Sequence, residues 1–162
     1  MLKTSVLVSG GGTNLQALID ASARGKMQHV ELSLVVSNRA DAFALERAKR
    51  AGIRGEYVEK AGFEERLNAL LDEEGIGLIV LAGFLRILSG DFTRRWAGRI
   101  INIHPSLIPS FCGAGYYGLR VHEAALSRGV KVTGATEHFV NEIPDRGEII
   151  AQRALRVLPG DT

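Results

Sequence analysis

The feature that most constrains the fold of this chain is a regular alternation of apolar, β-branched runs with stretches of helical periodicity. Strands are predicted at 5–9, 30–37, 55–58, 78–83, 99–103, 131–140 and 149–157. Helices are predicted at 14–23, at 41–52 with its end at Gly52, at 63–74, after Ser89 and at 121–129. Strands this apolar, separated by helices, favour a sheet covered on both faces. The pattern therefore predicts a three-layer α/β domain with a mostly parallel central sheet whose later strands are mixed in direction.

Size and composition predict one compact domain over residues 1–162. The chain is 46% hydrophobic and 23% charged, which suits a single core. Its 20 basic residues are scattered among 18 acidic ones, so no nucleic-acid partner is expected. Cys112 is the only cysteine, which excludes an internal disulfide. Because no apolar run is long enough for a signal peptide or a membrane span, we expect a cytoplasmic protein with no membrane partner.

A glycine-rich turn follows the first predicted strand and opens the first predicted helix. Gly10, Gly11 and Gly12 precede Thr13 and Asn14. Backbone N–H groups and the helix dipole favour a phosphate at such a place. The spacing is not G-x-G-x-x-G and the lysine of a P-loop is absent, so a phosphate monoester fits better than a dinucleotide or a nucleoside triphosphate. The alternative is a tight turn in which glycine relieves steric strain and Asn14 caps the helix.

A second candidate segment, residues 84–88, follows the predicted strand at 78–83. Ligands in parallel sheets bind at the carboxyl ends of the strands. Leu85, Arg86, Ile87 and Leu88 suit an extended apolar ligand that bears carboxylates. The alternative is that the apolar side chains belong to the core and that the arginine is a surface charge.

The strongest chemical signal is the pair Asn102 and His104 at the end of another predicted strand. Strand alternation points both side chains to the same side. An amide that donates a hydrogen bond and an imidazole that carries charge are suitable partners for an oxygen that gains negative charge in a tetrahedral intermediate. The alternative is a histidine satisfied within the fold beside an asparagine that caps a loop.

Asp145 lies between the last two predicted strands, so the topology returns it towards the strand end that carries His104. A carboxylate near an imidazole favours the charged imidazolium. The alternative is an ordinary turn aspartate before Gly147. His138 either orients this loop or has a structural role. No metal is expected, because the histidines lack ligand-like spacing and carboxylates do not cluster.

Seven segments form a specific combination that extends from near residue 1 to the end of the chain. They are SGGGTNLQALI, the pair Ser37-Asn38, ADAFALERA, LAGFLRILS, NIHPSLIPSFCG, GVKVTGATEHFV and the final Asp161-Thr162. The glycine turn alone is unspecific, whereas GTNLQ, AGFLRILS and NIHPSL in this order are highly specific. Together they resemble the glycinamide ribonucleotide transformylase family of formyltransferases. The resemblance implies a Rossmann-like formyltransferase fold that transfers a formyl group from 10-formyltetrahydrofolate to the amine of glycinamide ribonucleotide in purine biosynthesis.

The resemblance also implies roles for individual residues. Gly12, Thr13 and Asn14 would bind the phosphate of glycinamide ribonucleotide. Asn102, His104 and Asp145 would be catalytic, with His104 as the proton donor and Asp145 favouring its charged form. The folate contacts carry over to Lys60, Leu85, Arg86, Ile87, Leu88, Asn102, Asn141, Glu142, Ile143, Pro144 and Asp145. Lys60 stands where relatives usually have an arginine, so the positive charge survives without the bidentate fork. The formyl folate is a co-substrate, no metal is required, and a monomer or homodimer is expected.

Three departures from the family pattern affect whether this chain is expected to bind substrate and catalyse the reaction. Glu137 replaces an apolar residue usual in its strand. Arg146 and Glu148 alter the pattern after the aspartate, which predicts a different placement of the Asp145 loop. The sequence stops at Thr162, where relatives continue into a helix whose acidic residue binds the substrate ribose. The resemblance thus implies a domain truncated at the C-terminus, with weakened glycinamide ribonucleotide binding and exposed apolar surface.

Two other functions remain open from the sequence. A formyltetrahydrofolate hydrolase or a methionyl-tRNA formyltransferase shares a strand-end N-x-H and a distant aspartate, although each normally carries an additional domain. The phosphate turn favours a nucleotide substrate over both. A catalytically silent protein that keeps the folate and phosphate pockets is the alternative outside enzymes.

Overall fold

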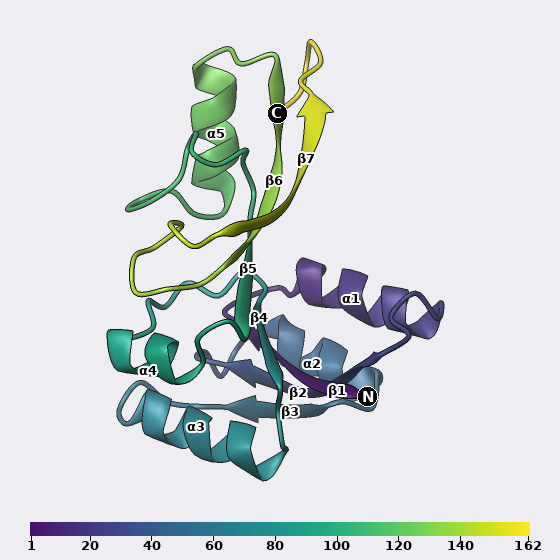
Figure 1. The fold of residues 1–162 in the computed structure, drawn as a ribbon. Coiled ribbons are helices and arrows are strands. Elements are labelled where there is room, and N and C mark those ends of the chain that lie inside the picture. The colour runs from purple at the N-terminus through teal and green to yellow at the C-terminus, as the bar shows by residue number, and fades with distance from the viewer. The chain divides into compact units, whose positions relative to one another are not determined.

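The computed structural model describes residues 1–162, which divide into two compact units, Met1–Leu88 and Ser89–Thr162. The first unit contains β1 (Leu2–Val8), α1 (Thr13–Ala23), β2 (Val30–Ser37), α2 (Phe43–Arg50), β3 (Arg54–Tyr57), α3 (Phe63–Glu73) and β4 (Leu78–Leu81) (Figure 1). The second contains α4 (Gly90–Arg95), β5 (Ile100–His104), α5 (Leu119–Ser127), β6 (Val132–Phe139) and β7 (Ile149–Arg156). Every strand and helix predicted from the sequence is present.

The strands of the first unit lie in the order β3-β2-β1-β4, and each neighbouring pair is parallel. Consecutive residues of β1 are fully buried, including Val6, Leu7 and Val8. Parallel strands read as continuous apolar runs because helices cover both of their faces. The predicted parallel α/β arrangement is confirmed for this part of the chain.

Helix α3 shows how the helical periodicity builds the core. Phe63, Leu67, Leu70 and Leu71 lie on one face and are buried. This i, i+4, i+7, i+8 spacing is that of an amphipathic helix, and each such side chain contributes about 2 kcal/mol when it leaves water. The preceding helix, α2, ends as predicted, because Gly52 has a positive φ of 69° just beyond it.

The second unit is built differently, since its strands are antiparallel in the order β5-β6-β7. Strand β6 alternates between exposed and buried residues, whereas every residue of β7 is exposed. The predicted change in strand direction towards the end of the chain is confirmed. None of the helices combines the length and the apolar character that crossing a lipid bilayer requires.

Candidate active site

The candidate active site in the second unit starts from one face of the β5–β6 pair. Asn102 lies opposite His138 in the register of the two strands, and His104 lies opposite Thr136. Because side chains alternate along a strand, these four residues share a face. His104, Thr136 and His138 are buried there, and Asn102 is half-buried. The sequence-based expectation that Asn102 and His104 point to the same side agrees with this geometry.

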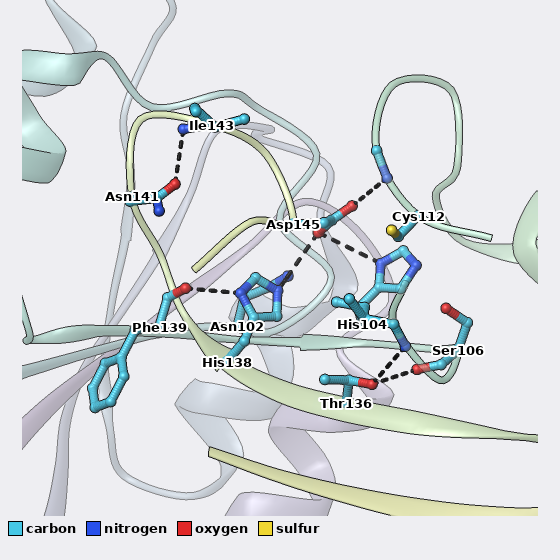
Figure 2. Close-up of polar contacts among 12 residues, drawn as sticks. Asn102, His104, Ser106, Cys112, Thr136, His138, Phe139, Asn141, Ile143 and Asp145 are labelled. Carbon is cyan, nitrogen blue, oxygen red and sulfur yellow. Dashed lines mark hydrogen bonds and ion pairs between the residues drawn. The ribbon is translucent and has the colours of Figure 1, made fainter. Parts of the chain in front are cut away.

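Asp145, in the connection from β6 to β7, lies between two imidazole rings (Figure 2). Its Oδ1 atom is 3.7 Å from Nδ1 of His104 and 3.6 Å from Nε2 of His138. Its Oδ2 atom accepts a hydrogen bond of 2.9 Å from the backbone N–H of Gly113. The structure therefore brings Asn102, His104 and Asp145 together, with one carboxylate facing two histidines.

Burial and charge oppose each other in setting the protonation of this cluster. Burial raises the pKa of Asp145, but the neighbouring His138, the Gly113 N–H and the charge of His104 outweigh it, so the pKa is lower than usual. Burial lowers the pKa of His138, but the Asp145 carboxylate and the Phe139 carbonyl outweigh it, so the pKa is raised. The cluster thus favours a negative carboxylate beside a readily charged imidazole.

Both ring nitrogens of His104 face oxygen atoms that only accept. Nδ1 faces the Asp145 carboxylate, and Nε2 donates to the carbonyl of Phe111 at 2.8 Å. Phe111 has a positive φ of 50°, which is unusual for a residue with a side chain. Strained backbone of this kind gathers at functional sites, and here it aims a carbonyl at His104.

Hydroxyl groups anchor the loop after β5. Thr136 Oγ1 donates to the Ser106 carbonyl at 2.7 Å and accepts from the Ile108 N–H at 3.0 Å. Ser106 Oγ donates to the Ser110 carbonyl at 2.6 Å. These bonds, drawn in part in Figure 2, fix the start of the segment that leads to the Phe111 carbonyl.

The Asp145 loop is fixed by close backbone approach. Asp145 has a φ of 55°, a left-handed conformation that aspartate tolerates better than most residues. A Cβ atom on Gly147 would lie 1.6 Å from the Phe139 carbonyl oxygen, so only glycine fits there. The Phe139 N–H in turn donates to the Glu148 carbonyl at 2.9 Å. The altered residues beside Asp145 thus accompany a loop that still places its carboxylate between the histidines.

The remaining predicted folate residues of this unit are on the surface. Asn141, Glu142, Ile143 and Pro144 are exposed, and Asn141 Oδ1 accepts from the Ile143 N–H at 2.9 Å. The Glu142 carboxylate lies 3.1 Å from the Arg94 guanidinium of α4. Glu137, the third altered residue of this region, is also exposed, so its charge is not buried.

The predicted phosphate turn lies in the first unit, at the start of α1. Gly12 occupies the N-cap position with a φ of 73°, and no side chain caps the helix. A Cβ atom at this glycine would lie 2.7 Å from the Ala44 Cβ atom and 2.9 Å from its Cα atom. Arg47 holds the turn by donating to the Gly11 carbonyl at 2.7 Å. Asn14 lies within the helix, so its alternative role as the cap is wrong.

The first turn of α1 differs from that of α3, which also begins after a left-handed glycine. Glu64 and Glu65 stand in the first turn of α3 and complement its dipole. The first turn of α1 has no acidic residue, and Thr13 and Asn14 there are exposed. The α1 terminus therefore suits an external anion better.

A buried serine joins this turn to the segment after β4. Ser9 Oγ donates to Asn38 Oδ1 at 2.7 Å and accepts from the Leu85 N–H at 2.9 Å. Leu85 and Ile87 are 57% and 74% exposed, whereas Leu88 is buried. The apolar part of this segment is thus divided between the surface and the core.

The two cations of this region, Arg86 and Lys60, are in contact near the start of α3. The Arg86 guanidinium lies 4.5 Å above the Phe63 ring centroid and donates to the Lys60 carbonyl at 3.3 Å. Lys60 itself is exposed. Stacking on an aromatic ring orients a guanidinium while leaving most of its N–H groups for a carboxylate.

Sequence reasoning missed Ser9 and left the role of His138 open. A buried serine at the end of a strand has no distinctive sequence pattern. The contact of His138 with Asn102 depends on strand register, which a single sequence specifies weakly. No group of three or more His, Cys, Asp or Glu side chains is arranged to hold a metal ion.

Comparison with known proteins places these features in one family. The family described as formyl transferase matches residues 2–162. Phosphoribosylglycinamide formyltransferase of Haemophilus influenzae is 40% identical over all of this chain, which covers 76% of that protein. The trifunctional purine biosynthetic protein adenosine-3 of Gallus gallus is 47% identical over 99% of this chain. The chain spans only 16% of that longer relative.

A solved structure extends the similarity to three dimensions. Glycinamide ribonucleotide transformylase 1 from Symbiobacterium toebii superposes with a TM-score of 0.91 at 42% sequence identity. The superposition covers 100% of this chain and 76% of that structure.

Proposed function

Because this chain belongs to the formyl transferase family, we propose that it transfers a formyl group from 10-formyltetrahydrofolate to the amine of glycinamide ribonucleotide. The observation that carries the proposal is the buried cluster in which Asp145 faces His104 beside Asn102. An amide donor, an imidazole and a carboxylate are the groups that acyl transfer to an amine needs when no enzyme nucleophile takes part.

The acceptor substrate is bound through its phosphate by the turn at Gly12, Thr13 and Asn14. The uncapped start of α1 offers backbone N–H groups, and the two exposed polar side chains add further donors. The phosphate also distinguishes glycinamide ribonucleotide from water as a formyl acceptor, because water has no group that binds at this turn. This difference favours formyl transfer to a nucleotide over hydrolysis of the formyl folate.

The residues predicted for the formyl folate fit its chemistry. Leu85 and Ile87 offer exposed apolar side chains to a planar ring system, and Arg86 and Lys60 offer cations to its glutamate carboxylates. In the second unit, the exposed residues Asn141, Glu142, Ile143 and Pro144 offer backbone and side-chain polar groups to a folate. Leu88 supports this segment from the core.

The formyl folate supplies an electrophilic carbonyl carbon, and the side chains of the cluster manage the charge and the proton. A new C–N bond forms to the substrate amine while the C–N bond to the folate nitrogen breaks. Asn102 donates an N–H to the oxygen that becomes negative. The folate nitrogen gains a proton from His104, and the proton that the amine loses restores the charged form of His104, which Asp145 stabilises.

Proton donation by His104 requires a local rearrangement. Its Nε2–H already donates to the Phe111 carbonyl, and its Nδ1 faces Asp145. Since Asp145 must stay to stabilise the imidazolium, the Phe111 carbonyl is the contact that opens when substrates bind. The strained φ of Phe111 makes that residue a low-cost place for the change.

The proposal is tested by measuring formyl transfer to glycinamide ribonucleotide and to water in parallel. We expect the nucleotide to be the preferred acceptor, and His104→Ala to lower kcat by about 1,000-fold, within the range for loss of a general acid. His122→Ala, at an exposed position in α5, is the matched control and should change kcat less than about twofold. Faster formyl loss to water, or a His104→Ala variant within a few-fold of the parent, would contradict the proposal. Binding of both ligands without any transfer would identify a silent binding protein.

A further inference from the structure

His138 is a buried histidine with three polar neighbours, and the proposed reaction does not use it. Its side chain is only 2% exposed. Nδ1 lies 2.8 Å from the Phe139 carbonyl, and Nε2 lies 3.2 Å from Asn102 Nδ2 and 3.6 Å from Asp145 Oδ1. Figure 2 shows the ring between the Phe139 carbonyl on one side and the amide and carboxylate on the other. The ring therefore touches two members of the proposed catalytic trio.

The neighbours fix which nitrogen of His138 carries the proton. A carbonyl oxygen only accepts hydrogen bonds, so Nδ1 beside Phe139 must be protonated in both charge states. In the neutral ring, Nε2 then has a lone pair and accepts from the Asn102 amide. One of the two amide N–H bonds of Asn102 is used in this way, and the planar geometry of the amide fixes the direction of the other.

We infer that His138 is a positioning residue, whose neutral ring holds the Asn102 amide so that its second N–H is directed at the oxygen that becomes negative in formyl transfer. The inference rests on the proposed function for its catalytic consequence, and on the contacts of His138 for its geometry. Preorganised donors are effective because they need no reorientation as the charge develops. An Asn102 side chain without His138 would rotate, or would turn its carbonyl oxygen towards the negative charge.

Protonation of His138 removes this support. When Nε2 is protonated, it and the Asn102 N–H are both donors and cannot hydrogen bond to each other. The nearest acceptor for Nε2 is then Oδ1 of Asp145 at 3.6 Å. The groups that face His138 are Asn102 from β5 and Asp145 from the β6–β7 connection, with His104 on the far side of the same carboxylate. A charged His138 therefore releases the Asn102 amide and competes with His104 for Asp145.

The first test is a double-mutant cycle on the rate of formyl transfer. Asn102→Ala should lower kcat by about 100-fold, as for loss of one oxyanion donor. His138→Asn keeps a donor for the Phe139 carbonyl, but its shorter side chain places no acceptor at the position of Nε2, so kcat should fall by about tenfold with little change in either KM. In the Asn102→Ala background, His138→Asn should cost less than about twofold more, because its effect passes through Asn102. A full tenfold loss in that background would overturn the inference.

The second test is rescue by a side chain that accepts but does not titrate. The carbonyl oxygen of His138→Gln reaches the region of Nε2, so this variant should recover most of the rate lost in His138→Asn. It should also lose the part of the acid limb of the kcat profile that His138 protonation causes. Equal rates for the Gln and Asn variants would overturn the inference, since they would indicate only a role in packing.

A third measurement does not depend on activity. On the alkaline side of the His138 titration, nitrogen NMR of the parent chain should show a protonated Nδ1, and a bare Nε2 whose resonance shifts in Asn102→Ala. A neutral ring protonated at Nε2 would overturn the inference even in a chain with full activity. If the parent transfers no formyl group, the proposed function fails, and this spectrum still decides the role of His138.

Discussion

The two units of the chain present their candidate functional groups in opposite ways. In the first, Thr13, Asn14, Leu85 and Ile87 are exposed, and the turn at Gly12 relies on backbone geometry. In the second, the reactive groups are buried or half-buried side chains held by hydrogen bonds and ion pairs within the cluster and with nearby backbone. The first arrangement suits recognition, where a ligand supplies the missing partners. The second suits chemistry, because buried polar groups interact strongly and are held in fixed positions.

The largest effect should come from removing the shared charge of the second unit. Asp145→Asn keeps an oxygen for the Gly113 N–H but takes the negative charge from both histidines, and should lower kcat by about 1,000-fold. Asp41→Asn in the first unit is the matched control, because that carboxylate is exposed and pairs only with Arg39. It should leave kcat within about twofold. Steady-state kinetics measure kcat for both variants. Similar losses of kcat would contradict the contrast between the two units.

A smaller effect, on binding rather than turnover, is expected from the glycine turn. Gly12→Ala forces a Cβ atom against Ala44 at a left-handed backbone position, which displaces the N–H groups of α1. The KM for glycinamide ribonucleotide should rise about tenfold or more, with a smaller change in kcat. Gly11→Ala has open space and serves as the control. A fall in kcat at constant KM would show that this region takes part in the chemistry.

The stability that the buried cluster of the second unit contributes should depend on pH through His138. Because the pKa of His138 is raised above its ordinary value of 6.5, its ionisation stabilises the fold fully below that value. The contribution is lost as the pH rises through the folded pKa. Chemical denaturation of the parent and of His138→Gln should therefore give a difference in unfolding free energy that shrinks above pH 6.5. A difference that grows with pH would have the wrong sign.

The smallest effect should come from an exposed contact at the edge of the buried cluster. Arg94 and Glu142 are 64% and 60% exposed, so solvent screens their ion pair. Arg94→Gln should change the free energy of unfolding by less than about 1 kcal/mol. Thermal unfolding of this variant is the appropriate measurement, and a loss of several kcal/mol would show that the exposed rim is as tightly coupled as the cluster.

The sequence predicted the strands and helices of both units better than the contacts of the candidate site. Strand β2 was predicted at its observed bounds, because continuous apolar runs identify parallel strands directly. Asn102 and His104 were placed on one face by alternation alone. The position of Asp145 depends on a left-handed φ and on the close approach of Gly147, and neither is visible as a sequence pattern. Contacts that depend on strand register, such as that of Asn102 with His138, could not be predicted from the sequence for the same reason.

The segment after β4 shows why the binding role of a residue cannot be assigned from its sequence context. Leu88 has the sequence context of its exposed neighbours Leu85 and Ile87, yet it is 6% exposed. Alternation after a strand end does not reveal which side chain turns inward, because the segment has left the sheet.

The Phe139 carbonyl excludes a side chain at Gly147. For protein engineering, the β6–β7 connection therefore contains positions that can be varied and one that cannot. Residues 141–144 are exposed, so we expect them to accept a library of substitutions aimed at folate analogues, the ligand proposed for them. Position 147 tolerates none, since even a methyl group would collide with main chain rather than with a movable side chain. We expect substitutions at 141–144 to change ligand specificity, whereas a substitution at Gly147 should displace the loop that holds Asp145.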